Sequence, residues 1–276
     1  MTSSSLRIKA FGVVLDVAWA AECGDAMREA VTISLPPGAR PSTDDAVHLV
    51  ELGREHDGRW SVTSKGSKRV YMRLDRLMHD LERDLAAAVA LHAPRHVFFH
   101  AGVVATGAGA LLLPGRSHAG KSRLTAALLG AGCGYISDEY AVIGPDLLVY
   151  AYPRRLSLRD ESGEQSLRST PAAWGSHVSD TPLVPVMVAG LRYRPTDGLR
   201  LRSADPGEVT MLLINNAIAA RLRPAEVLST AGAVARRSIG LVGTRGEADE
   251  AAERLLALLY SSSTKSSANA TRSRSR

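Results

Sequence analysis

Apolar residues follow two different spacings in the first third of the chain. Over residues 6–74 they form short runs separated by clusters of turn-forming residues, a pattern typical of β-strands. Over 75–92 leucines recur at helical spacing, and Asp75 is the expected N-cap of that helix. The pattern therefore predicts a β-rich N-terminal region, residues 1–92, that ends in an amphipathic helix.

Strand and helix patterns then alternate around one glycine-rich loop. Apolar runs at 97–104 and 110–113 predict two strands joined by a tight turn, because glycines stand between them. A helix is expected over 121–129 and a further strand over 133–136. This order of strand, loop, helix and strand indicates an α/β fold.

Further elements are expected in the second half of the chain. An apolar extended run at 183–193 predicts a strand, while 206–220, 224–237 and 247–260 have helical spacing. The polar segment 160–180 is interrupted by proline and glycine, so we expect a mobile loop there.

The composition changes near the C-terminal end. From residue 261 apolar residues almost disappear and serine and arginine dominate, which predicts a disordered Arg/Ser tail over 261–276. The pattern favours a flexible solubilising end over an RNA-binding segment. The α/β domain is therefore expected to cover residues 93–260.

The bulk composition restricts the function only weakly. The chain has 276 residues, 45% of them hydrophobic, which is enough to bury a full core. Its formal net charge of +6 includes three arginines of the tail, so the folded part is only mildly basic. Such an excess suits a phosphate-rich small ligand or an acidic partner, and a nucleic acid is not expected.

Cysteine content and hydropathy indicate the cellular setting. The two cysteines, Cys23 and Cys133, stand far apart and have no metal-ligand spacing around them, so neither a disulfide framework nor a zinc site is expected. No signal-peptide pattern and no bilayer-length apolar run is present. We therefore expect a cytoplasmic protein with no membrane partner.

The loop between the second strand and the helix carries the clearest chemical signal. The octet Gly115-Arg116-Ser117-His118-Ala119-Gly120-Lys121-Ser122 satisfies the pattern G-x-x-x-x-G-K-[ST], and Arg123 follows it. Its glycines let backbone N–H groups surround phosphate oxygens, its lysine reaches the β- and γ-phosphates, and its serine hydroxyl ligates Mg²⁺. The positive end of the following helix adds to this attraction. The sequence therefore predicts a binding site for a nucleoside triphosphate.

Two carboxylates and one histidine are the candidate catalytic groups. Asp138 and Glu139 follow the strand after the loop helix, where such an enzyme needs carboxylates to hold Mg²⁺ and to accept a hydroxyl proton. The alternative is that Ser-Asp-Glu forms a solvated turn. His100 lies in an apolar strand, where a histidine without a partner motif is typically a packed core group.

Three arginines beyond the acidic pair are candidates for a phosphate or substrate clamp. Apolar runs at 141–143 and 147–150 predict a second pair of strands, and Arg154, Arg155 and Arg159 follow it. A guanidinium group suits both phosphate and carboxylate, so these residues would contact the transferred phosphate or an acidic peptide end. A solvated basic edge is the alternative.

These motifs together resemble a known family. The stretch His100-Ala101-Gly102, the octet 115–122 and Ser137-Asp138-Glu139 are similar to the catalytic domain of bacterial HPr kinase/phosphorylase. The sequence resembles most closely the HPr-kinase-related proteins of ribosomal-peptide pathways, including lasso peptide kinases. This likeness covers about residues 98–159.

The resemblance implies a fold, a reaction and residue roles. The fold would be a P-loop kinase core related to phosphoenolpyruvate carboxykinase, and the reaction would use ATP and Mg²⁺ to phosphorylate a serine hydroxyl on a peptide or small protein. Asp138 would be the general base, and His100 would lie near the transferred phosphate. Glu139 stands where HPr kinases have a second aspartate, and Asp205-Pro206-Gly207-Glu208 lacks the arginine of the family's Pro-Gly-Arg-Asn stretch. A reverse phosphorylase activity is therefore not expected.

The leading hypothesis is an ATP-dependent serine kinase acting on a peptide or small protein. Lys121 and the loop would hold the phosphates, Ser122, Asp138 and Glu139 would place the metal, and Asp138 would accept the hydroxyl proton. A small-metabolite kinase and a non-catalytic nucleotide-binding regulatory module are the rival hypotheses. The acceptor, the nucleotide base and the formation of homo-oligomers stay open at this stage.

Overall fold

The chain forms two compact units, which are described one at a time. In this computed structural model the units are Met1–His96 and Val97–Arg276. The structure describes residues 3–115, 120–154, 156–159, 166–169, 181–196 and 198–273. Most of the loop expected over 160–180 therefore lies outside the described residues.

The first unit is built on one mixed sheet of six strands. Its strands lie in the order β3-β1-β2-β4-β5-β6, and only the pair β2 and β4 is parallel. The strands are β1 (Ser3–Ala10), β2 (Val13–Ala20), β3 (Arg40–Pro41), β4 (His48–Arg54), β5 (Trp60–Ser64) and β6 (Ser67–Tyr71). The predicted β-rich character of this region is confirmed.

Two α-helices accompany this sheet. The expected helix is present as α2 (Leu74–His92), in which Leu77, Leu81 and Leu85 are buried. Its N-cap is Arg73 and not Asp75, which lies in the first turn and forms an ion pair with Arg73. The sequence prediction missed α1 (Gly24–Ser34), which follows a 3-10 turn, η1 (Ala21–Cys23).

The second unit contains a mixed sheet with a parallel centre. The order is β11-β10-β7-β8-β14-β16-β15, and β9 also pairs with β7. Its strands are β7 (Val97–Thr106), β8 (Gly109–Pro114), β9 (Gly134–Ser137), β10 (Tyr140–Ile143), β11 (Val149–Tyr150), β14 (Pro185–Tyr193), β15 (Arg200–Ser203) and β16 (Ile239–Arg245). A separate hairpin joins β12 (Leu156–Arg159) and β13 (Ser166–Ser169). The strands β8, β14 and β16 run parallel to one another.

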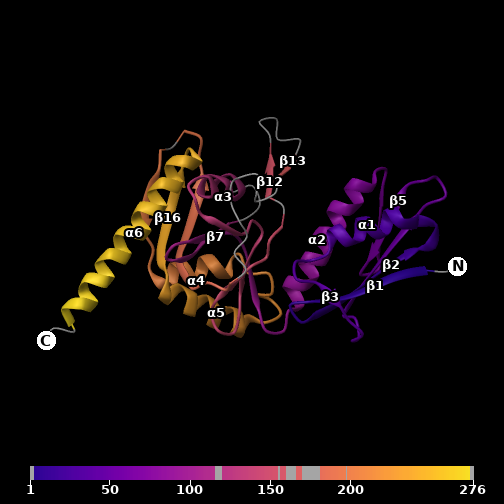
Figure 1. The fold of residues 1–276 in the computed structure, drawn as a ribbon, viewed down its shortest axis with the longest axis horizontal. Coiled ribbons are helices and arrows are strands. Elements are labelled where there is room, and N and C mark those ends of the chain that lie inside the picture. Colours follow the sequence, from indigo (N-terminus) through magenta and orange to yellow (C-terminus); the bar gives the residue numbers. More distant parts are fainter. Residues whose placement is uncertain are drawn as a thin grey trace. The chain divides into compact units, whose positions relative to one another are not determined.

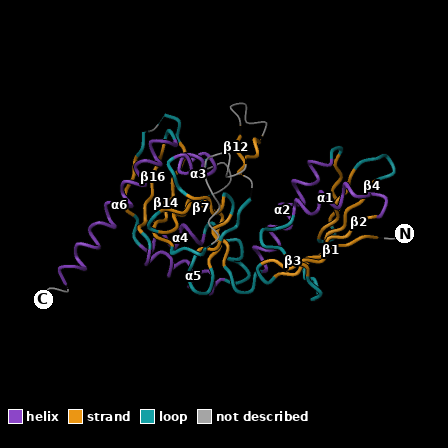
Figure 2. Tube along the Cα trace, viewed as in Figure 1, coloured by secondary structure: helices purple, strands orange, loops and turns teal. Residues whose placement is uncertain are grey.

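Helices cover both faces of this sheet (Figures 1 and 2). They are α3 (Lys121–Gly130), α4 (Pro206–Ile214), α5 (Pro224–Arg237) and α6 (Ala248–Ser273). Alternate residues of β8 point to opposite faces: Leu111 and Leu113 pack with α3 and α6, whereas Ala110 and Leu112 pack with α4 and α5. The unit is therefore a three-layer α/β/α structure in which β8 is buried on both sides.

Three expectations for this unit differ from the structure. The segment after Ile214 turns instead of continuing the helix to 220, and its residue Ala217 pairs with Phe99 of β7. The strand β16 was missed, because its glycines, Gly240 and Gly243, interrupt the apolar run. Helix α6 continues to Ser273 instead of giving way to a disordered tail at 261, because neither glycine nor proline follows residue 246 to end it.

The chain is thus a mixed α/β protein with two mixed sheets and six α-helices in the part that the structure describes. None of these described helices combines the length and the apolar character needed to span a bilayer. Both cysteines are buried, and they do not form a disulfide with each other.

Gly102 allows α3 to lie close to β7. A Cβ atom at this position would stand 2.6 Å from Oγ1 of the fully buried Thr125 in α3. We expect Gly102→Ala to lower the free energy of unfolding by about 1–3 kcal/mol, as overpacking does. In a Thr125→Ala background the penalty should be smaller, because the clashing oxygen is gone. Urea unfolding of the four chains measures this coupling.

Gly130→Ala is the matched control. It adds a methyl group at the end of the same helix, where no atom lies within 4 Å of the new Cβ. This substitution should be neutral or slightly stabilising. An equal penalty for Gly102→Ala in both backgrounds would show that Thr125 does not set the spacing.

Candidate functional site

The glycine-rich loop begins at the end of β8 and ends at the start of α3. Its first residue, Gly115, donates its backbone N–H to the carbonyl of His100 at 3.3 Å. Its last residue, Gly120, is the N-cap of α3 and has a left-handed conformation with φ of 77°. The predicted nucleotide-binding residues Arg116, Ser117, His118 and Ala119 lie outside the described residues.

Lys121 turns back toward the beginning of the loop. Its Nζ donates to the carbonyl oxygen of Gly115 at 2.8 Å. Burial lowers the pKa of this ammonium group, and the carboxylates of Asp138 and Glu139 oppose that shift. The predicted phosphate-binding lysine therefore spans the loop from its end to its start.

Ser122 and Asp138 meet directly, although 16 residues separate them along the chain. The Ser122 hydroxyl donates to Oδ2 of Asp138 at 2.8 Å, and both side chains are half-buried. Ser122 lies in the first turn of α3, and Asp138 follows β9. Two oxygen groups that the sequence assigns to one metal site are therefore neighbours.

The turn at the acidic pair is fixed by Ser137 and by β7. The buried Ser137 hydroxyl accepts backbone N–H groups from Glu139 at 3.2 Å and from Tyr140 at 3.0 Å. Ala101 of β7 donates its N–H to the carbonyl of Glu139 at 3.1 Å. The pair is thus held by a side-chain cap and by the neighbouring strand, not by a loosely solvated turn.

His100 is hydrogen-bonded both to the start of the glycine-rich loop, through its backbone, and to the acidic pair, through its ring. The carbonyl of Glu139 can only accept a hydrogen bond, so Nδ1 of His100, at 3.0 Å, carries the proton. Burial, together with the charge of Lys121, lowers the pKa of His100 to about 4. The imidazole is therefore neutral at physiological pH.

Arg154 is the one clamp candidate whose side chain the structure describes at the site. It forms an ion pair with Glu139, and its own carbonyl accepts the hydroxyl of Tyr135 at 2.6 Å. The Arg154 side chain is only 12% exposed. Arg155 lies outside the described residues, and of Arg159 only the backbone, at the end of β12, is described.

Arg123 and the stretch from Asp205 to Glu208 were also singled out in the sequence. Arg123 is exposed on the first turn of α3. The stretch from Asp205 to Glu208 caps α4: the Asp205 side chain accepts the N–H of Glu208 at 2.9 Å, and Glu208 forms an ion pair with Arg202. That stretch therefore has a local structural role in the described chain.

The sequence prediction missed Arg245 and Tyr193 at this site. Arg245 ends β16 and donates to the carbonyl of Gly120 at 2.7 Å, and its guanidinium lies over the ring of Tyr193, which ends β14. Neither residue belongs to a recognisable motif. Only the parallel order of the strands could have indicated them, since parallel strands end at a common edge.

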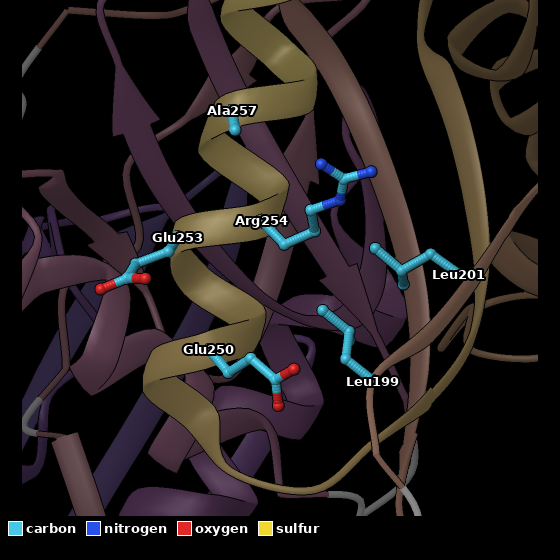
Figure 3. Close-up of a pocket in the computed structure, with 6 residues that line it drawn as sticks. All are labelled: Leu199, Leu201, Glu250, Glu253, Arg254 and Ala257. Carbon is cyan, nitrogen blue, oxygen red and sulfur yellow. The ribbon is translucent and has the colours of Figure 1, made fainter.

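A hollow lies elsewhere on the second unit, beside α6 (Figure 3). Its volume is about 560 Å³, and it is lined by Leu199, Leu201, Glu250, Glu253, Arg254 and Ala257. Arg254 reaches from the helix toward Leu201, whereas Glu253 points the other way. Among the predicted site residues that the structure describes, none lines this hollow.

The neutral His100 predicts a pH dependence of stability. Its pKa in the folded chain, about 4, is below the ordinary value of 6.5, so the unfolded chain binds more protons between these limits. The free energy of unfolding should therefore fall as the pH is lowered from 6.5 toward 4, with a slope approaching about 1.4 kcal/mol per pH unit from this group. Urea unfolding at a series of pH values measures the slope.

The variant His100→Gln is the comparison for this prediction. It retains a side-chain N–H donor but does not titrate, so its slope should be shallower than that of the wild-type chain. Proton NMR of the imidazole gives the pKa directly. An unshifted imidazole pKa, or equal slopes in the two chains, would contradict the buried neutral ring.

Comparison with known proteins finds no matching family model and no significantly similar curated protein. The functional argument therefore depends on the geometry and chemistry of the site.

Proposed function

We propose that this protein is an ATP- and Mg²⁺-dependent kinase that phosphorylates a hydroxyl group, a serine of a peptide or small protein. The hydrogen bond between Ser122 Oγ and Asp138 Oδ2 carries this proposal. It joins the motif hydroxyl to the carboxylate that phosphoryl transfer requires, at the end of the loop that suits phosphates. On this proposal the second unit is a P-loop kinase core of the HPr kinase/phosphoenolpyruvate carboxykinase type.

The oxygen groups of the site fit Mg²⁺. In phosphate sites this ion binds one or two carboxylates, phosphate oxygens and water, and it needs no larger cluster of protein ligands. Ser122 and Asp138 supply a hydroxyl and a carboxylate 2.8 Å apart. When bound, the ion would neutralise charge on the β- and γ-phosphates.

Glu139 is less available than Asp138 as a metal ligand. Its carboxylate is already paired with Arg154, so it would have to leave that guanidinium to become a metal ligand. Ser122 and Asp138 are therefore the better-supported ligands. If Glu139 did leave Arg154, the Arg154 guanidinium would be available beside the acidic pair to bind a phosphate oxygen.

The phosphates would be held by backbone groups and by Lys121. The first N–H groups of α3 have no partners within the helix, and they carry the positive end of its dipole. In the described structure Lys121 donates to the carbonyl of Gly115. A phosphate oxygen would replace that carbonyl as the acceptor.

The chemical step needs one base. The acceptor hydroxyl oxygen forms a bond to the γ-phosphorus, the bond from that phosphorus to the bridging oxygen of ADP breaks, and Asp138 takes the hydroxyl proton. The neutral His100 fixes the backbone of Glu139 and adds no positive charge. Positioning and charge neutralisation supply most of the acceleration.

Lys121 and Asp138 have separable roles that two variants test. Lys121→Met should weaken ATP binding strongly and abolish phosphate transfer, because the variant lacks the buried ammonium. Asp138→Asn should keep most of the ATP affinity, since its amide oxygen can still ligate the metal and accept from Ser122, but should lower turnover by at least about 100-fold, because an amide does not take the hydroxyl proton. ATP affinity is measured by calorimetry and transfer by mass spectrometry of candidate serine-containing peptides.

The outcomes separate the rival functions. A gain of one phosphate on a peptide serine, lost in Asp138→Asn, is the expected result. Phosphate on a small metabolite and on no peptide would favour a metabolite kinase. ATP binding with no phosphorylated product would favour a nucleotide-binding regulatory module, and equal loss of ATP binding in both variants would contradict the assigned roles.

A further inference from the structure

A buried arginine lies directly behind the end of the glycine-rich loop. Arg245 is the last residue of β16 and is only 2% exposed. The strands β8, β14 and β16 are parallel, so their carboxyl ends meet at one edge of the sheet, where the loop also begins. Tyr193, the register partner of Arg245, ends β14 at the same edge.

The Arg245 guanidinium is held in one orientation by three groups. Its Nη2 donates to the carbonyl of Gly120 at 2.7 Å, and its Nη1 donates to the carbonyl of Gly246 at 2.8 Å. Its central carbon lies 5.2 Å from the centroid of the Tyr193 ring, within the range of a cation–π contact. The side chain therefore acts as a rigid bracket between two backbone segments.

This arrangement is energetically unusual. In the part of the chain that the structure describes, no carboxylate forms an ion pair with Arg245. Burying a cation is unfavourable, and burial here lowers the pKa of the guanidinium, although the charge of Glu247 opposes that shift. The Gly120 and Gly246 carbonyls and the Tyr193 ring are the groups that offset this cost.

The bond to Gly120 has a consequence on the phosphate side of the loop. The carbonyl of Gly120 also accepts the N–H of Leu124 at 3.2 Å, in the first turn of α3. In a trans peptide the carbonyl and the following N–H point in opposite directions. Holding the Gly120 carbonyl in this position therefore directs the N–H of Lys121 out of the N-terminal end of α3, where phosphate would bind.

Gly120 and Arg245 also restrict each other. Gly120 has a left-handed φ of 77°, and a Cβ atom there would lie 2.4 Å from Nη2 of Arg245. The glycine of the motif is thus required both by its conformation and by the space that the guanidinium takes.

We infer that Arg245 is a positioning residue for nucleotide binding: it fixes the peptide between Gly120 and Lys121 so that the first turn of α3 presents the N–H of Lys121 to phosphate. This inference depends on the proposed function, because it assumes that the loop binds a nucleoside triphosphate. Arg245 does not touch the nucleotide and acts through Gly120.

The test measures ATP affinity by calorimetry in the presence of Mg²⁺, on the full chain. Arg245→Met keeps the length of the side chain and removes every donor, and it should weaken binding by about tenfold or more, the scale of a lost hydrogen bond from a charged donor. Arg245→Lys retains a charged donor but not the two-carbonyl bracket, so it should restore only part of the affinity. Arg202→Met, on the adjacent strand β15, is the control and should bind ATP like the wild-type chain.

A second control separates positioning from general destabilisation. Leu255→Ala removes a buried side chain of α6 far along the sequence from the loop and lowers the melting temperature without touching Gly120. It should leave ATP affinity unchanged. Arg245→Met should lower ATP affinity even if its melting temperature falls no further than that of Leu255→Ala. If Arg245→Met does not fold, Arg245→Lys and Tyr193→Leu give the same comparison with the guanidinium site altered less.

The outcomes distinguish this inference from the proposed function. If Lys121→Met loses ATP while folded Arg245 variants bind it like the wild-type chain, the inference is overturned and the nucleotide site stands. A loss in the Arg245 variants no larger than in Leu255→Ala also overturns it. If the wild-type chain itself binds no ATP, the proposed function fails first.

Discussion

The site depends on the backbone of β7 at His100 and Ala101. On one side the His100 carbonyl accepts the N–H of Gly115, where the glycine-rich loop begins. On the other side the Ala101 N–H and the His100 ring both bind the carbonyl of Glu139. Because one strand is bonded to both segments, the loop and the acidic pair keep a fixed separation, and Ser122 can reach Asp138.

The charged groups of the site form two sets, one at the acidic pair and one at Gly120. Asp138 and Glu139 face Lys121 and Arg154 at the front, and Arg245 stands behind Gly120. Burial weakens the cationic form of Lys121 and Arg245, so an anion that enters the loop would be stabilised by both and would stabilise them in return. A polyphosphate carries the negative charge and the oxygen acceptors that would match these cationic groups.

The elements with strong local patterns were predicted from the sequence alone. Strands β7 and β8 and helices α2, α3 and α5 were expected close to their observed bounds, because their apolar residues repeat without interruption. Helix α1 and strand β16 were missed, since polar residues and glycines interrupt their patterns and burial comes from distant partners. The end of α4 depended on the pairing of Ala217 with Phe99, a tertiary contact that no local pattern records.

The sequence by itself determined which residues form the glycine-rich loop and the acidic pair, because both are defined by spacing over a few residues. Only the tertiary structure decided that Ser122 bonds Asp138, that Glu139 pairs with Arg154, and that Arg245 holds Gly120 from 125 residues away. The physical reason is strand order. Parallel pairing of β8, β14 and β16 brings their carboxyl ends to one edge, and such long-range pairing leaves no signature in local sequence.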